Sequence, residues 1–146
     1  MTIEGVGDLL SHFARCCGPV PPEPIAGYIT LGRGVSIHRV DCGNFKRLES
    51  SQPARVISVS WGGAQDQSFP VEVNVRAFDR RGLLRDITAV LADMKINIQG
   101  MNTLTHQADG IADMNLKITV SDLEELSRVL ARIQGLPNVL SARRHA

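Results

Sequence analysis

The second half of the chain alternates between two apolar periods, and this alternation restricts its fold more than any other feature of the sequence. A period of two residues, typical of half-buried strands, runs through 69–78 and 111–120, two further segments are also predicted as strands, and a helical period of 3.6 residues runs through two segments. The strand segments are 69–78, 96–105, 111–120 and 138–144, and the helical segments are 79–94 and 123–133. A turn is predicted at His106–Gly110.

The order strand-helix-strand-strand-helix-strand predicts a ferredoxin-like α+β domain, with a four-stranded antiparallel sheet and both helices on one face. Ser121 and Glu124 have the spacing of a capping box at the start of the second helix, and Gly135 and Pro137 follow its end. Polar residues alternate with the apolar ones, so the free sheet face meets solvent or a partner. Those residues are Glu72, Asn74, Arg76, Asn115 and Lys117.

The first half is less regular. Apolar residues at helical spacing predict a short amphipathic helix, and they are Val6, Leu9, Leu10 and Phe13. Four prolines between Pro19 and Pro24 then exclude a helix. Two strands, 25–31 and 35–38, flank the Gly32-Arg33-Gly34 segment, which is typical of a hairpin turn.

A helix over 41–50 with Asp41 as its cap comes next, followed by a strand over 54–61. Residues 62–68 lack apolar periodicity and are the predicted linker. The expected division is a small module over 1–61, this linker, and the α+β domain over 69–146.

Composition excludes several classes of function. The 146 residues carry a net charge of +1, so bulk electrostatics do not favour nucleic acid, and aromatic residues make up only 4%, too few for a surface that stacks bases. No apolar run is long enough to cross a membrane, and no secretory leader is visible. We therefore expect a cytoplasmic location, and the abrupt start at Met1 suggests a piece of a longer protein.

Three cysteines and one histidine in the first third are candidate metal ligands. Cys16 and Cys17 are adjacent, 20 residues separate them from His38, and Cys42 follows at His-x3-Cys spacing. Gly18 and the next proline provide the sharp turn that two adjacent ligands require. The set suits a closed, structural Cys3His zinc site, which would stabilise a module of about 60 residues.

Two other interpretations remain open from the residues alone. The cysteines could be ordinary core residues, since free cysteine is often buried, or they could have a redox role, such as a strained disulfide between the adjacent pair. Catalysis has no support, because no nucleophile-base set, carboxylate pair or phosphate loop stands out. Cys42 activated by His38 would be the one conceivable nucleophile.

Two stretches resemble a known family. "ARCCGPVPPEPIAGYITLGRGVSIHRVDC" is similar to the C-terminal zinc-finger (conserved-cysteine) domain of long RelA/SpoT-homologue enzymes, and "FDRRGLLRDITAVLADMKINI" resembles the ACT domain, also called RRM, that follows it. The resemblance extends from about Val6 to Arg144. One departure is Pro21-Pro22-Glu23, where the family usually has Pro-Gly-Asp, so the turn after the cysteines is expected to differ.

The resemblance implies a function. Full-length relatives are GTP pyrophosphokinases of the stringent response, which make (p)ppGpp by moving pyrophosphate from ATP to GTP or GDP. Their catalytic domains are N-terminal and absent here, so this piece is expected to be no enzyme by itself. It resembles the regulatory end that docks on the ribosome near the A-site tRNA and restrains the catalytic domains.

The resemblance also assigns residues. Cys16, Cys17, His38 and Cys42 fall on the family's metal or conserved-cysteine positions, and Arg33 falls on a position implicated in contacting ribosomal RNA. A guanidinium between two glycines is free to fork onto phosphate oxygens. Arg15 and Arg39 flank the cysteines and histidine and could enlarge this basic patch, or all three arginines are simply solvated.

The ACT half has three candidate roles. In many metabolic enzymes, paired ACT domains bind an amino acid near the loop after the first strand, which here contains Asp79, Arg80 and Gly82. The alternatives are ribosome docking and self-association, with a homodimer formed through the ACT domain or the cysteines. Since 111–118 contains no Phe or Tyr, any RNA contact would depend on charge and shape rather than on stacking.

Overall fold

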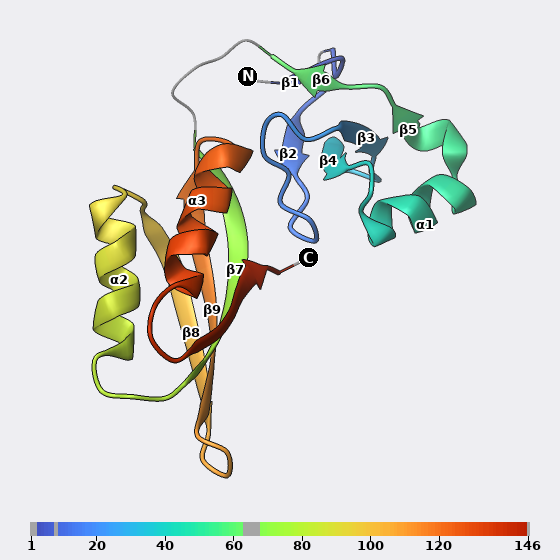
Figure 1. Ribbon diagram of the computed structural model, residues 1–146. Helices are drawn as coiled ribbons and strands as arrows, with labels where there is room; N and C mark the ends of the chain where they lie inside the picture. Colours follow the sequence, from blue (N-terminus) through green and yellow to red (C-terminus); the bar gives the residue numbers. More distant parts are fainter. Residues whose placement is uncertain (1–2, 8, 63–67, 146) are drawn as a thin grey trace. The chain divides into compact units, whose positions relative to one another are not determined.

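The computed structural model describes residues 3–7, 9–62 and 68–145, and it divides into two compact units (Figure 1). The first unit extends to Phe69, and the second is Pro70–His145. Of the predicted linker, residues 63–67 lie outside the described residues. Among the residues that the structure describes, none of the helices has the length and apolar character needed to cross a membrane.

The first unit is a small mixed sheet with one helix. Its main sheet has the order β2-β4-β3-β5, and β1 pairs separately with β6. The elements are β1 (Ile3–Glu4), β2 (Ser11–Phe13), β3 (Ile25–Ile29), β4 (Val35–Arg39), α1 (Gly43–Ser51), a 3-10 turn η1 (Pro53–Arg55), β5 (Val56–Ile57) and β6 (Ser60–Trp61). The predicted hairpin is present, since β3 and β4 pair antiparallel with Ile29 opposite Val35.

The hairpin turn depends on glycine. Gly34 has a φ of +74°, and a Cβ added there would lie 2.2 Å from the Leu10 carbonyl oxygen. The same stretch is fixed by a backbone hydrogen bond in which the Val35 N–H donates to that carbonyl over 2.8 Å. A side chain at position 34 would therefore prevent the approach that joins β4 to the segment before β2.

The helix predicted from Val6 to Phe13 is wrong. Gly5 has a φ of +102°, where an added Cβ would lie 2.5 Å from the Ser58 carbonyl oxygen, and β2 then runs parallel to β4. The apolar spacing is a coincidence of this sequence, because Leu10 is 83% exposed and does not belong to a buried helical face. The last three residues of the predicted helix, Ser11–Phe13, pair with β4 instead, whereas a helix of two turns would have left many of its backbone groups unpaired.

Two predicted caps are displaced by one residue. Cys42, not Asp41, is the N-cap of α1. In the second unit Asp122, not Ser121, caps its helix, and the Asp122 carboxylate accepts a hydrogen bond from the Glu125 N–H over 2.8 Å. The strand predicted over 54–61 is also interrupted, because η1 occupies its start and only two short strands remain.

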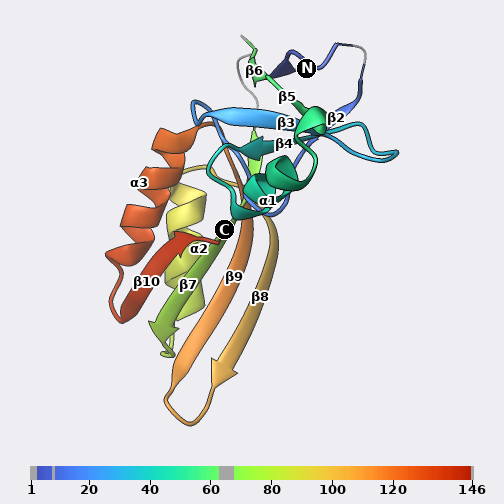
Figure 2. The ribbon, with the colours of Figure 1, turned by 90° about the vertical axis from the view of Figure 1, so that its right-hand side faces the viewer.

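The second unit has the predicted order and the ferredoxin-like fold. Its elements are β7 (Phe69–Phe78), α2 (Leu83–Asp93), β8 (Ile98–His106), β9 (Ile111–Val120), α3 (Leu123–Gln134) and β10 (Val139–Arg144). The sheet order is β10-β7-β9-β8, with β10 antiparallel to β7 and β8 antiparallel to β9. Both helices cover the same face of the sheet (Figures 1 and 2), as predicted.

Alternation along the central strands separates the two faces. On β7, Val71, Val73 and Val75 are almost fully buried beneath the helices. On the opposite face Asn74 donates to the Asp113 carboxylate over 2.6 Å, and the Arg76 guanidinium lies 3.6 Å from the same carboxylate. The polar sheet face predicted from the sequence is thus an organised network of side chains.

Candidate metal centre

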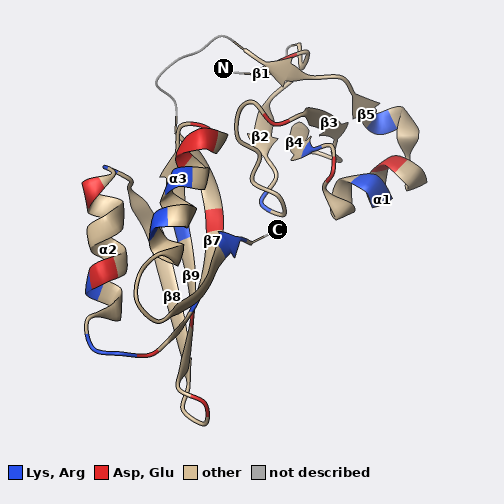
Figure 3. Ribbon diagram, viewed as in Figure 1, with Lys and Arg blue, Asp and Glu red and all other residues tan. Residues whose placement is uncertain are grey.

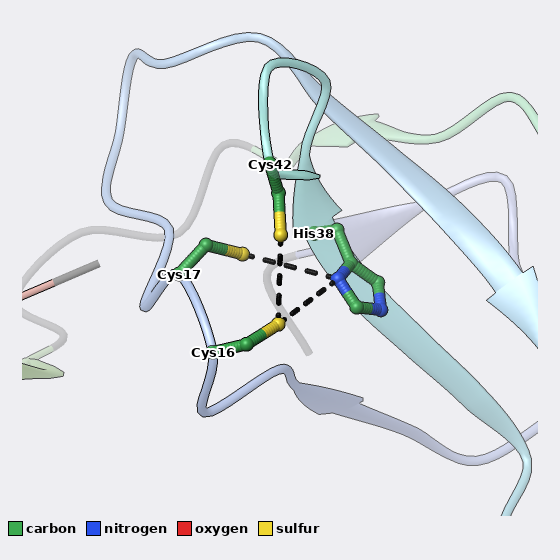
Figure 4. Close-up of side chains that lie close together, drawn as sticks. All are labelled: Cys16, Cys17, His38 and Cys42. Atoms are coloured by element: carbon green, nitrogen blue, oxygen red, sulfur yellow. Dashed lines mark hydrogen bonds between the residues drawn. The ribbon is translucent and has the colours of Figure 1, made fainter. Parts of the chain in front are cut away.

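Three separate segments bring four potential ligands together. Cys16 and Cys17 lie in the turn after β2, His38 is on β4, and Cys42 caps α1 (Figure 4). One ligand atom from each residue lies within 4.8 Å of all the others. Cys16 Sγ is 3.5 Å from both Cys42 Sγ and His38 Nδ1, and Cys17 Sγ is 3.9 Å from His38 Nδ1.

Backbone hydrogen bonds hold these segments in place. The Ala14 N–H donates to the Ile37 carbonyl over 2.8 Å, which fastens the end of β2 beside β4. The Gly18 N–H donates to the Ala14 carbonyl over 3.0 Å and closes the turn that carries both cysteines. On the other side, the Cys42 N–H donates to the Arg39 carbonyl over 3.1 Å. The sharp turn expected at Gly18 is present, and it allows the side chains of the two adjacent cysteines to face the same point.

The spacing of the four atoms fits a tetrahedral zinc ion. Zinc bonds of about 2.3 Å to sulfur and about 2.0 Å to nitrogen place tetrahedral ligand atoms roughly 3.5–3.8 Å apart. Three of the six separations, at 3.5, 3.5 and 3.9 Å, lie at or close to that range, and all four atoms lie within 4.8 Å of one another. Three thiolates and one imidazole form a closed structural donor set, with no position left for a substrate.

A hydrogen bond orients the histidine ring. His38 Nε2 lies 3.0 Å from Ser36 Oγ, and the Ser36 hydroxyl in turn donates to the Tyr28 carbonyl over 3.5 Å. With its proton given to Tyr28, the Ser36 oxygen is free to accept from Nε2–H. That tautomer leaves the Nδ1 lone pair directed at the sulfurs, which is the state a metal requires.

Electrostatics differ among the three cysteines. Burial raises the pKa of Cys17 to about 12, although the Arg39 N–H donates to its sulfur over 3.3 Å. Burial also raises the pKa of Cys16. Burial acts the same way on Cys42, yet its pKa is lowered overall, because the backbone amides of Phe45 and Asn44 at the start of α1 favour the thiolate.

Burial lowers the pKa of His38, and the charge of His12 lowers it further. The ring therefore stays neutral near pH 7, as a ligand must. The three cysteines are free thiols, and Cys17 and Cys42 also pack with Ala14 and Phe45 in a small apolar cluster. The core-packing interpretation and the metal interpretation thus both apply to the three cysteines.

The three arginines expected to bind RNA occupy different environments. Arg33 is exposed at the tip of the β3–β4 hairpin, where its backbone N–H donates to Thr30 Oγ1 over 3.1 Å. Arg15 is exposed in the turn that carries the cysteines. Arg39 is only 16% exposed and lies 3.6 Å from the carboxylates of both Glu23 and Asp41, so its charge is already compensated.

The loop predicted to bind an amino acid borders a pocket of about 430 Å³. Asp79, Arg80 and Gly82 line it together with the start of α2, and Thr103 and Met114 of β8 and β9 complete the wall. The sequence did not single out these last two residues. Arg80 is held in place, since its guanidinium donates to Asp86 over 2.8 Å and to the Pro137 carbonyl over 3.1 Å.

Comparison with known proteins accounts for both units. Residues 65–144, more than half of the chain, match the family model of the ACT domain, and residues 1–62 match that of the RelA/SpoT RIS domain. The chain is a RIS–ACT region of the RelA/SpoT family. The resemblance seen in the sequence is therefore confirmed. Below, the first unit is called the RIS module and the second the ACT domain.

Curated relatives of the RIS–ACT region carry the name GTP pyrophosphokinase. That of Haemophilus influenzae is 43% identical over 142 residues, covering 97% of this chain and 19% of the relative. That of Escherichia coli K12 is 41% identical over 144 residues, covering 99% of this chain and 19% of the relative. The chain thus spans about a fifth of the length of these relatives.

Among solved structures, the crystal structure of the ACT domain from GTP pyrophosphokinase of Chlorobium tepidum is similar to this chain with a TM-score of 0.47 and 23% identity. The match covers 53% of this chain and 99% of that one.

Sequence reasoning about the RIS module missed the groups that support the four ligands. Ser36 lies two residues before His38 on the same strand, so strand alternation could have indicated that their side chains share a face. The Arg39 N–H bond to Cys17 had no signal in the sequence, because it depends on how two distant segments meet.

Proposed function

We propose that this RIS–ACT region is the regulatory part of a longer GTP pyrophosphokinase of the stringent response. In this proposal it docks on ribosomal RNA near the A-site tRNA and controls catalytic domains located elsewhere in the parent chain, in the cytoplasm. The RIS module over 1–61 and the ACT domain over 69–146 act as its two functional parts. Relatives of that name, about 40% identical over nearly the whole chain, support the proposal.

The observation that carries the proposal is the placement of Arg33. Its guanidinium extends from an exposed hairpin tip, and the described residues show no carboxylate paired with it. Elsewhere the charges are mixed, since acidic and basic residues are interspersed along α2 and α3 (Figure 3). An uncompensated guanidinium at a hairpin tip suits a phosphate backbone, to which it can donate two parallel hydrogen bonds.

The proposed zinc ion would make that hairpin rigid. Cys16, Cys17, His38 and Cys42 would hold it, and its chemistry would be structural: it would join the turn after β2, strand β4 and the start of α1. Their approach to within 4.8 Å of one another and the Ser36 hydroxyl oxygen 3.0 Å from His38 Nε2, which leaves Nδ1 facing the sulfurs, support this role. Metal analysis of protein purified without chelator, expected to give one zinc per chain, tests it.

Co-sedimentation with ribosomes tests the docking role. Arg33→Glu is expected to weaken ribosome association while thermal unfolding stays unchanged, because the side chain is exposed. Arg143→Glu, the same charge change at an exposed position on β10, is the matched control and should bind like the wild type. Equal binding by all three proteins would rule out Arg33 as a docking residue.

A second candidate function is amino-acid binding by the ACT domain. The pocket of about 430 Å³ beside Asp79, Arg80 and Gly82 favours it, since that volume accommodates a small ligand. Calorimetry with valine, isoleucine and leucine would show saturable heat for one of them if this role is correct. The absence of heat at millimolar ligand would rule out binding of these three amino acids by the pocket.

A homodimer, formed through the ACT domain or through the cysteines, would fit an autoinhibitory role. Sedimentation velocity with and without reductant separates the two routes. A dimer that disappears with reductant forms through cysteines, and one that persists forms through the ACT domain.

A further inference from the structure

The Cys/His cluster contains one pair of sulfur atoms placed to react with each other. Cys16 Sγ and Cys42 Sγ are 3.5 Å apart, so closing to a disulfide length of about 2.05 Å requires a movement of roughly 1.5 Å. The two residues come from different segments, the turn after β2 and the start of α1. Their contact therefore joins two parts of the RIS module that are 26 positions apart in the sequence.

A pocket gives small solutes access to these sulfurs. It measures about 300 Å³ and is lined by all three cysteines together with Arg39, Asn44 and Arg47, among others. This volume exceeds what two oxygen atoms need, since a liquid water occupies about 30 Å³. Cys17 and Cys42 are only 2% and 5% exposed, whereas Cys16 is partly exposed. Cys16 is thus the sulfur that a small oxidant meets first.

We propose that Cys16 and Cys42 are an oxidisable pair, and that hydrogen peroxide converts them to a disulfide and releases the metal. The Cys16 thiolate attacks one peroxide oxygen, the O–O bond breaks, and sulfenic acid and hydroxide form. The Cys42 thiolate then attacks the Cys16 sulfur and expels a second hydroxide. Two thiolates lose two electrons in total, and one peroxide gains them.

Cys17 is excluded as the partner by backbone geometry. Adjacent Cα atoms are 3.80 Å apart across a trans peptide, below the 4.4 Å minimum of ordinary disulfides, so a Cys16–Cys17 bond would be strained. The Arg39 N–H also donates to the Cys17 sulfur over 3.3 Å and withdraws electron density from it. Cys17 is therefore not the partner of Cys16, and Cys42 is the cysteine for which a contact with the Cys16 sulfur, at 3.5 Å, is observed.

Oxidation would replace the cross-link made by the metal with a Cys16–Cys42 disulfide. After oxidation only Cys17 and His38 remain as ligands, which is half of the four that a structural zinc site requires. The disulfide still connects the turn after β2 to α1, so the oxidised module keeps this connection without the metal. The metal-release half of the inference rests on the proposed zinc site, whereas the choice of cysteines rests on geometry alone.

The test treats the whole reduced chain with hydrogen peroxide. Zinc release is followed with a colorimetric zinc chelator, and free thiols are alkylated before non-reducing peptide mapping. We expect one zinc released per Cys16–Cys42 disulfide formed, Cys17 recovered as the alkylated residue, and full rebinding after dithiothreitol and zinc are added. A Cys16–Cys17 or Cys17–Cys42 bond, an intermolecular bond, or zinc release without any disulfide would overturn the proposal.

Two variants and a metal-free sample test the choice of cysteines separately from the release of zinc. Cys17→Ser is the matched control and should still form the Cys16–Cys42 bond. Cys16→Ser should slow oxidation about tenfold or more, since it removes the one cysteine sulfur that is partly exposed. If the purified protein holds no zinc, the zinc site of the proposed function fails. The same peptide mapping on that metal-free protein then decides the cysteine pair by itself.

Discussion

At the scale of single residues, the hydroxyl of Ser36 determines what His38 can do. The Ser36 hydroxyl donates its proton to the Tyr28 carbonyl, so its oxygen can only accept from His38. That oxygen lies 3.0 Å from His38 Nε2. The imidazole is 5% exposed and packs against the Phe45 ring at a centroid distance of 5.6 Å, so it has little freedom to turn. One serine thus sets both the tautomer and the direction of the ligand nitrogen.

Ser36→Ala is therefore expected to weaken zinc binding by about 10- to 100-fold, since the ring loses its oriented partner and both tautomers become accessible. Competition with a chromogenic chelator measures the change. Ser50→Ala, at an exposed position on α1, is the control and should leave the affinity unchanged. Equal affinity in Ser36→Ala and the wild type would show that packing alone orients the ring.

At the scale of elements, the accuracy of the sequence prediction depended on how local the signal was. The two central strands and both helices of the ACT domain were predictable because each carries a clean period: β9 was predicted over Ile111–Val120, where the structure has it, whereas β8 is exposed almost throughout and carries no such alternation. The segment before β2 was not, because four apolar residues matched a helical period by chance. Its actual conformation depends on pairing with β4, which lies more than 20 positions away.

The candidate site was also predictable from the sequence only where its signals are local. The four ligand types and their spacing were evident in the sequence, as was the sharp turn that Cys16 and Cys17 need. Their supporting contacts were not, because the Arg39 N–H and the Ser36 hydroxyl become relevant only when β2, β4 and α1 are assembled. The salt bridges that compensate Arg39 likewise come from the tertiary fold, which is why that arginine differs from Arg33.

The hairpin offers a test of how strongly one glycine determines an element. Gly34→Ala is expected to destabilise the RIS module, because its φ of +74° is strained for alanine and the new Cβ would lie 2.2 Å from the Leu10 carbonyl oxygen. Gly32→Ala is the matched control: its φ of +93° is also positive, but nothing lies within 4 Å of an added Cβ. We expect the control to lower the free energy of unfolding by about 1–2 kcal/mol, and Gly34→Ala to lower it clearly more.

Urea unfolding followed by tryptophan fluorescence measures both variants. The chain contains one tryptophan, Trp61, which lies in β6 of the RIS module, so its emission reports on that module. Its indole N–H donates to the Glu23 carbonyl over 2.9 Å, and this bond breaks when the module unfolds. Equal losses in Gly32→Ala and Gly34→Ala would show that strain, and not the approach of Leu10, limits position 34.

At the scale of the whole molecule, the two units have different sources of stability. The ACT domain buries two helices against one sheet face and contains most of the largest fully buried side chains, among them Ile87, Leu91 and Ile118. The RIS module has a smaller apolar core built around Val35 and Ile37, and its second cluster consists largely of the cysteines and their neighbours. With the proposed zinc ion bound, a module of this size would gain a large share of its stability from the metal.

Removal of zinc is therefore expected to affect one unit and spare the other. With excess chelator, the transition reported by Trp61 fluorescence should shift to lower temperature by at least about 5 °C, since metal-binding free energy is lost from the RIS module alone. The helical signal in far-ultraviolet circular dichroism, which comes mainly from α2 and α3, should keep its own transition. Cys16→Ser provides the control, because a site without that ligand should already melt at the lower temperature and show no further shift with chelator. An unchanged Trp61 transition in chelated wild-type protein would show that apolar packing around the cysteines, not zinc, stabilises the RIS module.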